Sequence, residues 1–258
     1  MDSQSPVIPD PASMSLLMLA GHLPPTDQYS TFIHLFPGNN AHPPWGTKGF
    51  FQFGITAYVG GRETGRIESG VCDENGNMKV EINPAAETGA PAQGMYIVEC
   101  HHAKEIPVEV YGFHVHKATG TYVSCNISPF IGDKLYPEVH TNQLENTLFW
   151  PGIIADEDNE PYSVVVNPYD AVMGFQIHLM TGSGVVARTE TLRLKAKTSQ
   201  EFSLCRLFED FERDIRKHNG MFSYCISSQY KLVTYFMLRN KIHKVMSMMD
   251  HLHNFCLS

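Results

Sequence analysis

The chain has 258 residues, a formal net charge of −8 and a hydrophobic content of 43%. This length is enough for one large domain with a sizeable core. The acidic balance excludes the strongly basic surface that binds nucleic acid, and no apolar run reaches the roughly 20 residues that a membrane span needs. The apolar stretch Met14 to Ala20 has no preceding Lys or Arg, so we expect no signal peptide. Six scattered cysteines then favour a reducing, cytoplasmic location.

Residues 1–45 are rich in Pro, Ser, Asn and Gly, with two short apolar islands at residues 15–20 and 32–36. Turn-forming residues at this density interrupt regular structure. We therefore expect an irregular N-terminal arm that packs in part on the domain that follows.

The middle of the chain, residues 46–197, has the pattern of successive short strands. Runs of β-branched and aromatic residues such as Phe50 to Val59, Ile106 to Val115 and Val172 to Met180 alternate with turn formers. Clear turns fall at Gly60-Gly61 and at residues 181–184. Short strands at this spacing without intervening helices predict an antiparallel Greek-key β-sandwich.

The pattern changes after residue 197, and residues 198–258 are predicted to form a helical C-terminal extension. Leu204, Leu207, Phe208, Phe211 and Ile215 recur at helical spacing. A second helix is predicted from Ser228 to Phe255, because its apolar residues gather on one broad face. Such apolar faces need a partner, so these helices are the expected interface for a protein partner or for self-association. We find no internal repeat in the sequence.

The segment Gly112-Phe113-His114-Val115-His116 carries the sharpest chemical pattern. In a strand, residues two apart face the same side, so the two histidines point together. Two imidazoles on one face can bind a single transition metal, and imidazole suits copper and zinc. Two half-buried histidines satisfied by hydrogen bonds are the alternative that the pair alone leaves open.

This segment resembles the copper-binding strand of the copper/zinc superoxide dismutases. In that family a cysteine follows the second histidine by nine residues, and Cys125 stands at that spacing. Ile153 to Asp158 resembles the family segment after the zinc loop, and Gly174 to His178 resembles the strand that supplies a further copper histidine. The resemblance implies a dismutase-like sandwich over about residues 49–196, with copper held by His114, His116 and His178.

The departures from the family pattern bear on activity. The stretch Ser128-Pro129-Phe130-Ile131 stands where the family has the histidine that bridges copper and zinc. His140 is the nearest candidate for a further ligand, and no His-x-x-Asp follows it, so zinc binding of the family type is not expected. Arg193 or Arg188 is the candidate guide for superoxide. No cysteine lies near either arginine, and Cys125 is either free or paired with Cys72, Cys100 or Cys205.

Two functions follow from this reading, in addition to an unrelated sandwich with a chance pair of histidines. The first is a copper-binding, dismutase-like protein with weak or altered activity toward superoxide, because without the bridging imidazole another acid must supply the proton. The second is a catalytically inactive dismutase-like domain that serves as a structural or protein-interaction module.

Overall fold

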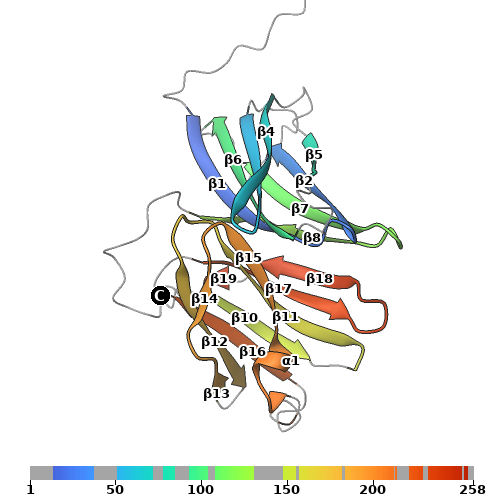
Figure 1. Ribbon diagram of the computed structural model, residues 1–258, viewed down its shortest axis with the longest axis vertical. Coiled ribbons are helices and arrows are strands. Elements are labelled where there is room, and N and C mark those ends of the chain that lie inside the picture. The colour runs from blue at the N-terminus through green and yellow to red at the C-terminus, as the bar shows by residue number, and fades with distance from the viewer. Residues whose placement is uncertain are drawn as a thin grey trace, which may run out of the picture.

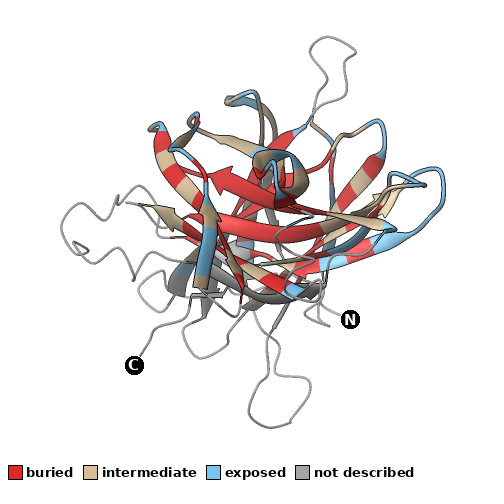
Figure 2. Cartoon of the chain, turned by 90° about the horizontal axis from the view of Figure 1, so that it is seen from below, coloured by how far each residue is buried: buried red, intermediate tan, exposed pale blue. Residues whose placement is uncertain are grey.

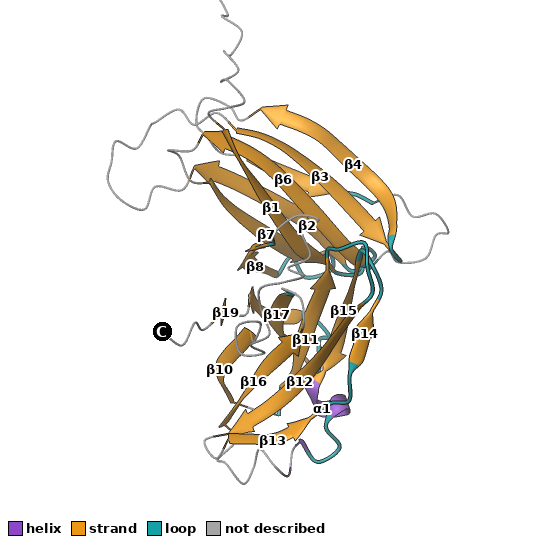
Figure 3. Ribbon diagram, turned by 90° about the vertical axis from the view of Figure 1, so that its left-hand side faces the viewer, coloured by secondary structure: helices purple, strands orange, loops and turns teal. Residues whose placement is uncertain are grey.

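The computed structural model describes residues 14–37, 51–71, 78–84, 93–103, 108–130, 148–154, 157–181, 184–211, 213, 221–228, 232–251 and 253–254. These residues form two β-sandwich lobes, one N-terminal (residues 14–130) and one C-terminal (residues 148–254), which are stacked one upon the other (Figures 1 and 3). All the strand pairs between described residues are antiparallel. None of the helices in these residues is long and apolar enough to cross a membrane.

The N-terminal lobe consists of two sheets. Sheet A has the strand order β4-β3-β6-β1-β9, and sheet B has the order β5-β2-β7-β8. The strands are β1 (Met14–Leu23), β2 (Tyr29–Pro37), β3 (Phe51–Val59), β4 (Arg62–Val71), β5 (Met78–Ile82), β6 (Gly94–Ala103), β7 (Val108–His116), β8 (Tyr122–Asn126) and β9 (Ser128–Pro129). Alternate residues of both sheets, among them Ile33, Ile55 and Val98, form the core between them.

The C-terminal lobe also consists of two sheets. Sheet C has the order β13-β12-β16-β10-β19, with β14 also paired to β12, and sheet D has the order β15-β11-β17-β18. The elements are β10 (Leu148–Ile154), β11 (Asn159–Asn167), β12 (Met173–Thr181), β13 (Gly184–Arg188), β14 (Leu192–Leu194), β15 (Thr198–Ser203), α1 (Leu204–Leu207), β16 (Met221–Ser228), β17 (Val233–Asn240), β18 (Met246–His251) and β19 (His253–Asn254).

The two lobes have the same topology. Strands β1 to β9 take the same places in sheets A and B that β10, β11, β12, β13, β15, β16, β17, β18 and β19 take in sheets C and D. Only β14 and α1 have no counterpart in the described part of the N-terminal lobe. The chain is therefore a tandem duplication of one sandwich, which the sequence analysis did not detect.

The hairpins β7–β8 and β17–β18 show the duplication in atomic detail. His116 N donates a hydrogen bond to Thr121 O (2.8 Å), and the His116 carbonyl oxygen accepts one from Gly120 N (2.8 Å). In the other lobe, Asn240 N donates to Val245 O (2.8 Å), and Lys244 N donates to Asn240 O (2.9 Å). Gly120 and Lys244 occupy the same turn position with φ of 70° and 58°. Residues of β7 and β17 thus correspond at a constant offset, His116 with Asn240.

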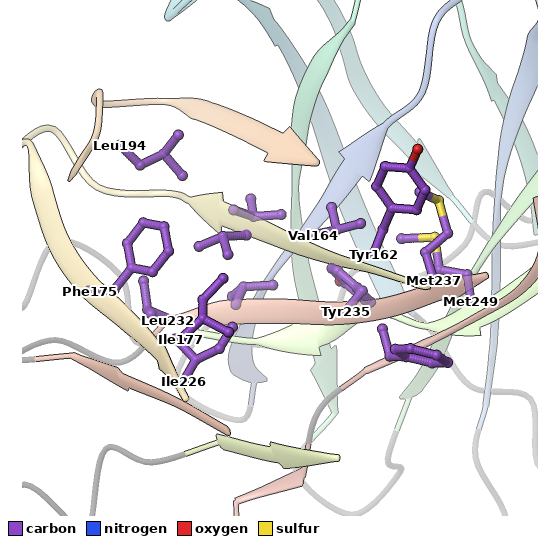
Figure 4. Packing of buried hydrophobic residues seen from close by; sticks show 14 of the residues in the cluster. Tyr162, Val164, Phe175, Ile177, Leu194, Ile226, Leu232, Tyr235, Met237 and Met249 are labelled. Atoms are coloured by element: carbon purple, nitrogen blue, oxygen red, sulfur yellow. The ribbon is translucent and has the colours of Figure 1, made fainter. Parts of the chain in front are cut away.

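Sheet D lies in the middle of the molecule and is buried on both faces. Consecutive residues of β11 and β17, such as Val164, Val165 and Val166, are all buried. One face packs on sheet C, where Phe202 contacts Phe175, and the other face packs on the N-terminal lobe. The resulting cluster runs from Phe175 to Met249 (Figure 4), and buried residues are concentrated at the centre of the molecule (Figure 2).

The predicted C-terminal helical extension is wrong. Helical residues are few in the described part of the chain: the single turn α1, which Ser203 caps by accepting a hydrogen bond from Arg206 N, and Phe211 and Arg213 a few residues later. Strands β16, β17 and β18 lie where the second helix was expected. A strand buried on both faces is apolar at nearly every position, so its sequence also satisfies a helical spacing. The segments on which we expected an interface are therefore strands in the described residues, and association with a protein partner or a second copy stays a prediction.

The domain limits also differ from the expectation. The predicted irregular arm contains β1 and β2, which are separated by a turn at residues 26–28. The strands predicted within residues 46–197 are divided between the two lobes. The prediction of a mainly β chain with antiparallel sheets is confirmed.

Candidate functional site

His114 and His116 lie on β7 and point to the same face of sheet B. His114 is 1% exposed, and its Nδ1 forms a hydrogen bond with Thr31 Oγ1 (3.1 Å). Burial, together with the positive charge of His22, lowers its pKa to about 3, so the ring is neutral near neutral pH. His116 is half-buried, and its Nδ1 bonds Thr119 Oγ1 (3.0 Å).

The third predicted ligand, His178, lies in the other lobe. It is on β12 of sheet C, on the face turned away from the core, where its Nε2 bonds Ser227 Oγ (2.8 Å). Sheet D lies between sheet C and the N-terminal lobe, so the structure does not bring His178 to His114 and His116. Burial, followed by the charge of Arg188, lowers the pKa of His178.

The remaining predicted residues are also dispersed. Arg193 is exposed on β14 and pairs with Gly174 of β12, and His140 lies outside the described residues. Among the residues that the structure describes, no three His, Cys, Asp or Glu side chains are close enough to hold one metal ion. The described residues therefore do not fit the three-histidine copper site that the resemblance implies.

Cys125 is a buried free thiol. Burial raises its pKa to about 12, so the reactive thiolate is suppressed. Cys100 and Cys205 also carry reduced thiols, whereas Cys72 lies outside the described residues. Cys125 therefore forms no disulfide with Cys100 or Cys205, two of the pairings that the sequence left open.

A group of polar side chains, of which one is fully buried and three are partly buried, lies where the two lobes meet. We call His22, Ser199, Glu201 and Arg239 the charged centre. His22 comes from β1 of the N-terminal lobe, and the other three come from β15 and β17 of sheet D. Glu201 Oε1 lies 3.1 Å from His22 Nε2, and its Oε2 lies 2.6 Å from the Arg239 guanidinium. Each carboxylate oxygen of Glu201 thus has its own partner, one in the N-terminal lobe and one in the C-terminal lobe.

The His22 ring has a hydrogen-bond partner at each of its two nitrogens. Its Nδ1 lies 2.9 Å from Ser199 Oγ, and that hydroxyl donates its single hydrogen to the Gly94 carbonyl. Toward His22 the hydroxyl is therefore an acceptor, as is the ionised carboxylate of Glu201. Both ring nitrogens of His22 therefore face acceptors, and Glu201 lies between the His22 imidazole and the Arg239 guanidinium.

Burial alone would raise the pKa of Glu201, but the hydrogen bonds and charges of His22 and Arg239 outweigh it. They hold the pKa at about 2. Arg239 in turn lies over the Tyr162 ring, with its guanidinium carbon 4.8 Å from the ring centroid. A buried carboxylate with two charge-assisted hydrogen bonds is a structural anchor, because truncating either partner leaves an uncompensated charge.

Further hydrogen bonds join the lobes around this centre. The Tyr235 hydroxyl donates to the Ala20 carbonyl (2.6 Å), and Met246 N donates to the Tyr29 hydroxyl (2.9 Å). Two other buried polar atoms, Tyr96 Oη and His114 Nε2, have no hydrogen-bond partner among the described residues. No pattern in the sequence marks the charged centre, because its residues belong to no motif and His22 and Glu201 are 179 positions apart.

Comparison with known proteins gives no matching family model and no matching curated protein. The resemblance of strand β7 to the superoxide dismutases is neither supported nor contradicted by this result and stays a prediction.

Proposed function

We propose that this chain is a non-catalytic structural and protein-interaction module, built from two copies of one sandwich that the charged centre joins into a single body. The observation that carries the proposal is that the ionisable groups of the charged centre bind one another. His22, Glu201 and Arg239 are saturated by one another across the joint between the lobes.

The protonation states of the buried groups support this proposal. A general acid or base works best when its pKa lies near the operating pH. The pKa of Glu201 is about 2 and that of His114 is about 3, so neither group exchanges a proton near neutrality. The buried thiol of Cys125, with a pKa of about 12, is likewise a poor nucleophile.

Copper loading tests the proposal against the dismutase-like alternative. The purified chain, together with the variants His116→Ala and His178→Ala, is incubated with copper, desalted and assayed for bound metal and superoxide consumption. His243→Ala is the matched control, because His243 is an exposed histidine in the β17–β18 turn. We expect little bound copper, no difference among the four proteins and no superoxide consumption above that of buffer.

About one copper per chain that is lost in both His116→Ala and His178→Ala but kept in His243→Ala would overturn the proposal. Consumption of superoxide that depends on the same two histidines would overturn it as well.

A further inference from the structure

The turns of the hairpins β7–β8 and β17–β18 share one backbone conformation but carry different side chains. Residues 117–120 read Lys-Ala-Thr-Gly, and their counterparts, residues 241–244, read Lys-Ile-His-Lys. The N-terminal turn shows that this backbone forms without a large apolar residue and without a second lysine. The isoleucine and the second lysine of the C-terminal turn are therefore not required by the fold of the hairpin.

Lys244 is held in a backbone conformation that disfavours its side chain. Its φ is 58°, in the left-handed region where its counterpart Gly120 has a φ of 70°, and a residue with a Cβ is strained there. Lys244 is exposed, and among the residues that the structure describes its ammonium forms no ion pair. Strain that no contact within the chain offsets is typical of a residue that is kept for binding.

Ile242 lies at the tip of the same turn and is 72% exposed, more than any other large apolar side chain in the described part of the chain. The Asn240 side chain fixes the turn, because its Oδ1 accepts hydrogen bonds from Ile242 N (3.0 Å) and His243 N (2.8 Å). The turn thus holds an aliphatic side chain and a cation close together in solvent. Binding through this turn would order little additional backbone, which favours affinity.

The charges of the two turns single out Lys244. Backbone hydrogen bonds join Lys117 and Lys241 to the segments that carry the exposed acids Asp27 and Asp158, so the charge of each of these two lysines has an acid nearby. Lys244 adds a positive charge that the N-terminal turn does not have. The net charge of −8 belongs to the whole chain, and at physiological salt charges more than about 8 Å away are largely screened. A partner that touches the tip of β17–β18 therefore meets chiefly the exposed side chains of this turn.

We infer that the β17–β18 turn binds the surface of an anionic lipid bilayer, with Ile242 at the boundary of the acyl chains and Lys244 at a headgroup phosphate. A bilayer places anionic phosphate directly above an apolar layer, which matches a cation close to an aliphatic tip. A nucleic acid would pair with Lys244 but leave Ile242 in water, and a purely apolar partner would bury the charge of Lys244. The turn projects from the edge of the molecule, where a flat surface can reach it (Figure 1).

The contact is peripheral and reversible. One aliphatic residue and a cation contribute less than a single acyl chain, which itself gives only marginal membrane binding. The inference goes beyond the proposed function and does not depend on it. Copper loading tests that function, whereas vesicle binding tests the turn, so either can fail without the other.

Co-sedimentation of the full chain with vesicles measures this binding. Vesicles of equal parts phosphatidylserine and phosphatidylcholine are compared with vesicles of phosphatidylcholine alone, at millimolar lipid and physiological salt. We expect binding to the anionic vesicles only. Lys244→Gly should weaken it about fivefold, the contribution of one lysine at such a surface, and Ile242→Ala about tenfold, because part of the side chain no longer leaves water.

The duplication supplies matched variants. Ala118→Ile places the aliphatic side chain on the equivalent turn of the other lobe and should strengthen binding severalfold. Val172→Ala and Lys195→Gln are the controls, because both residues are exposed and lie at the opposite end of sheet D from the turn, by the register of β11 with β17. We expect neither control to change binding.

Loss of binding in Lys244→Gly is not explained by unfolding, because glycine relieves the strain at this position. A wild-type chain that stays in the supernatant with anionic vesicles would overturn the inference, as would equal binding to both kinds of vesicle or equal losses in the turn variants and the controls. Heparin is the soluble polyanion for comparison. Capture on heparin that requires Lys244 but not Ile242, without vesicle binding, would assign the turn to a polyanion and overturn the lipid contact.

Discussion

Replacing Glu201 by Gln tests whether the charged centre holds the two lobes together. The substitution preserves the shape of the side chain but removes the charge that His22 and Arg239 share. The lowering of the Glu201 pKa from 4.5 to about 2 corresponds to about 3 kcal/mol of stabilisation. Removing one partner of a buried ion pair costs about 3–5 kcal/mol. Because Arg239 is 22% exposed and is partly solvated in the variant, we expect a loss of about 3 kcal/mol.

Urea unfolding followed by tryptophan fluorescence measures this loss. With a slope of up to about 3 kcal/mol per molar urea, the midpoint of Glu201→Gln should fall by about 1 M or more. The matched control is Lys79→Gln, which alters the counterpart position on the exposed face of sheet B and should cost less than about 1 kcal/mol. Equal midpoints for Glu201→Gln and Lys79→Gln at pH 7 would refute the reasoning.

The same pair of proteins has a defined pH dependence. The folded pKa of Glu201 lies below its unfolded value, so its contribution is complete above about pH 4.5 and is lost as the pH falls toward 2. The difference in unfolding free energy between the wild type and Glu201→Gln should therefore shrink over that interval. A difference that stays constant from pH 7 to pH 3 would show that the carboxylate charge is not the cause.

The duplication and the core packing give two further predictions. Lys244 has a positive φ at the position where its counterpart, Gly120, is glycine. Lys244→Gly should therefore stabilise the chain by about 0.5–1 kcal/mol, and Gly120→Lys should destabilise it by a similar amount. Changes of the same sign in the unfolding temperature of the two variants would contradict the correspondence. A Cβ on Gly21 would lie 2.2 Å from the buried Tyr96 ring, so Gly21→Ala should cost about 3 kcal/mol or more. Gly54→Ala is the control, because the nearest atom to its added Cβ would be the Ile67 carbonyl oxygen, 3.8 Å away. A similar cost for both variants would argue against the packing around Tyr96.

Local pattern was enough to predict the β content, because most strands of the N-terminal lobe face a core on one side. Strand β7 alternates between half-buried Tyr111, Phe113 and Val115 and buried Val110, Gly112 and His114, which is the period of a half-buried strand. Strand β17 has no such alternation, because Val233 to Met237 are all buried. Its sequence therefore does not distinguish a strand from a helix.

The duplication and the charged centre could not be predicted from the sequence, for a different reason. Between Val108–Asn126 and residues 232–250, only Tyr111 and Lys117 are identical to their counterparts, so the repeat is preserved in hydrogen bonding and not in residue type. The pairing of His22 with Glu201 depends on how two lobes dock, which no local pattern encodes. The spacing of His114 and His116 suggested a metal site. In the structure, however, the histidine that joins the two lobes is His22, which belongs to no motif.

Hydrogen exchange followed by mass spectrometry gives the most direct test of the claim that the two repeats form one body. We predict that amides in β3 of the N-terminal lobe and in β12 of the C-terminal lobe exchange through one common opening with the same free energy. In Glu201→Gln, the amides of the two lobes should exchange with two different opening free energies. Two clearly different values in the wild-type chain, unchanged by Glu201→Gln, would contradict the account.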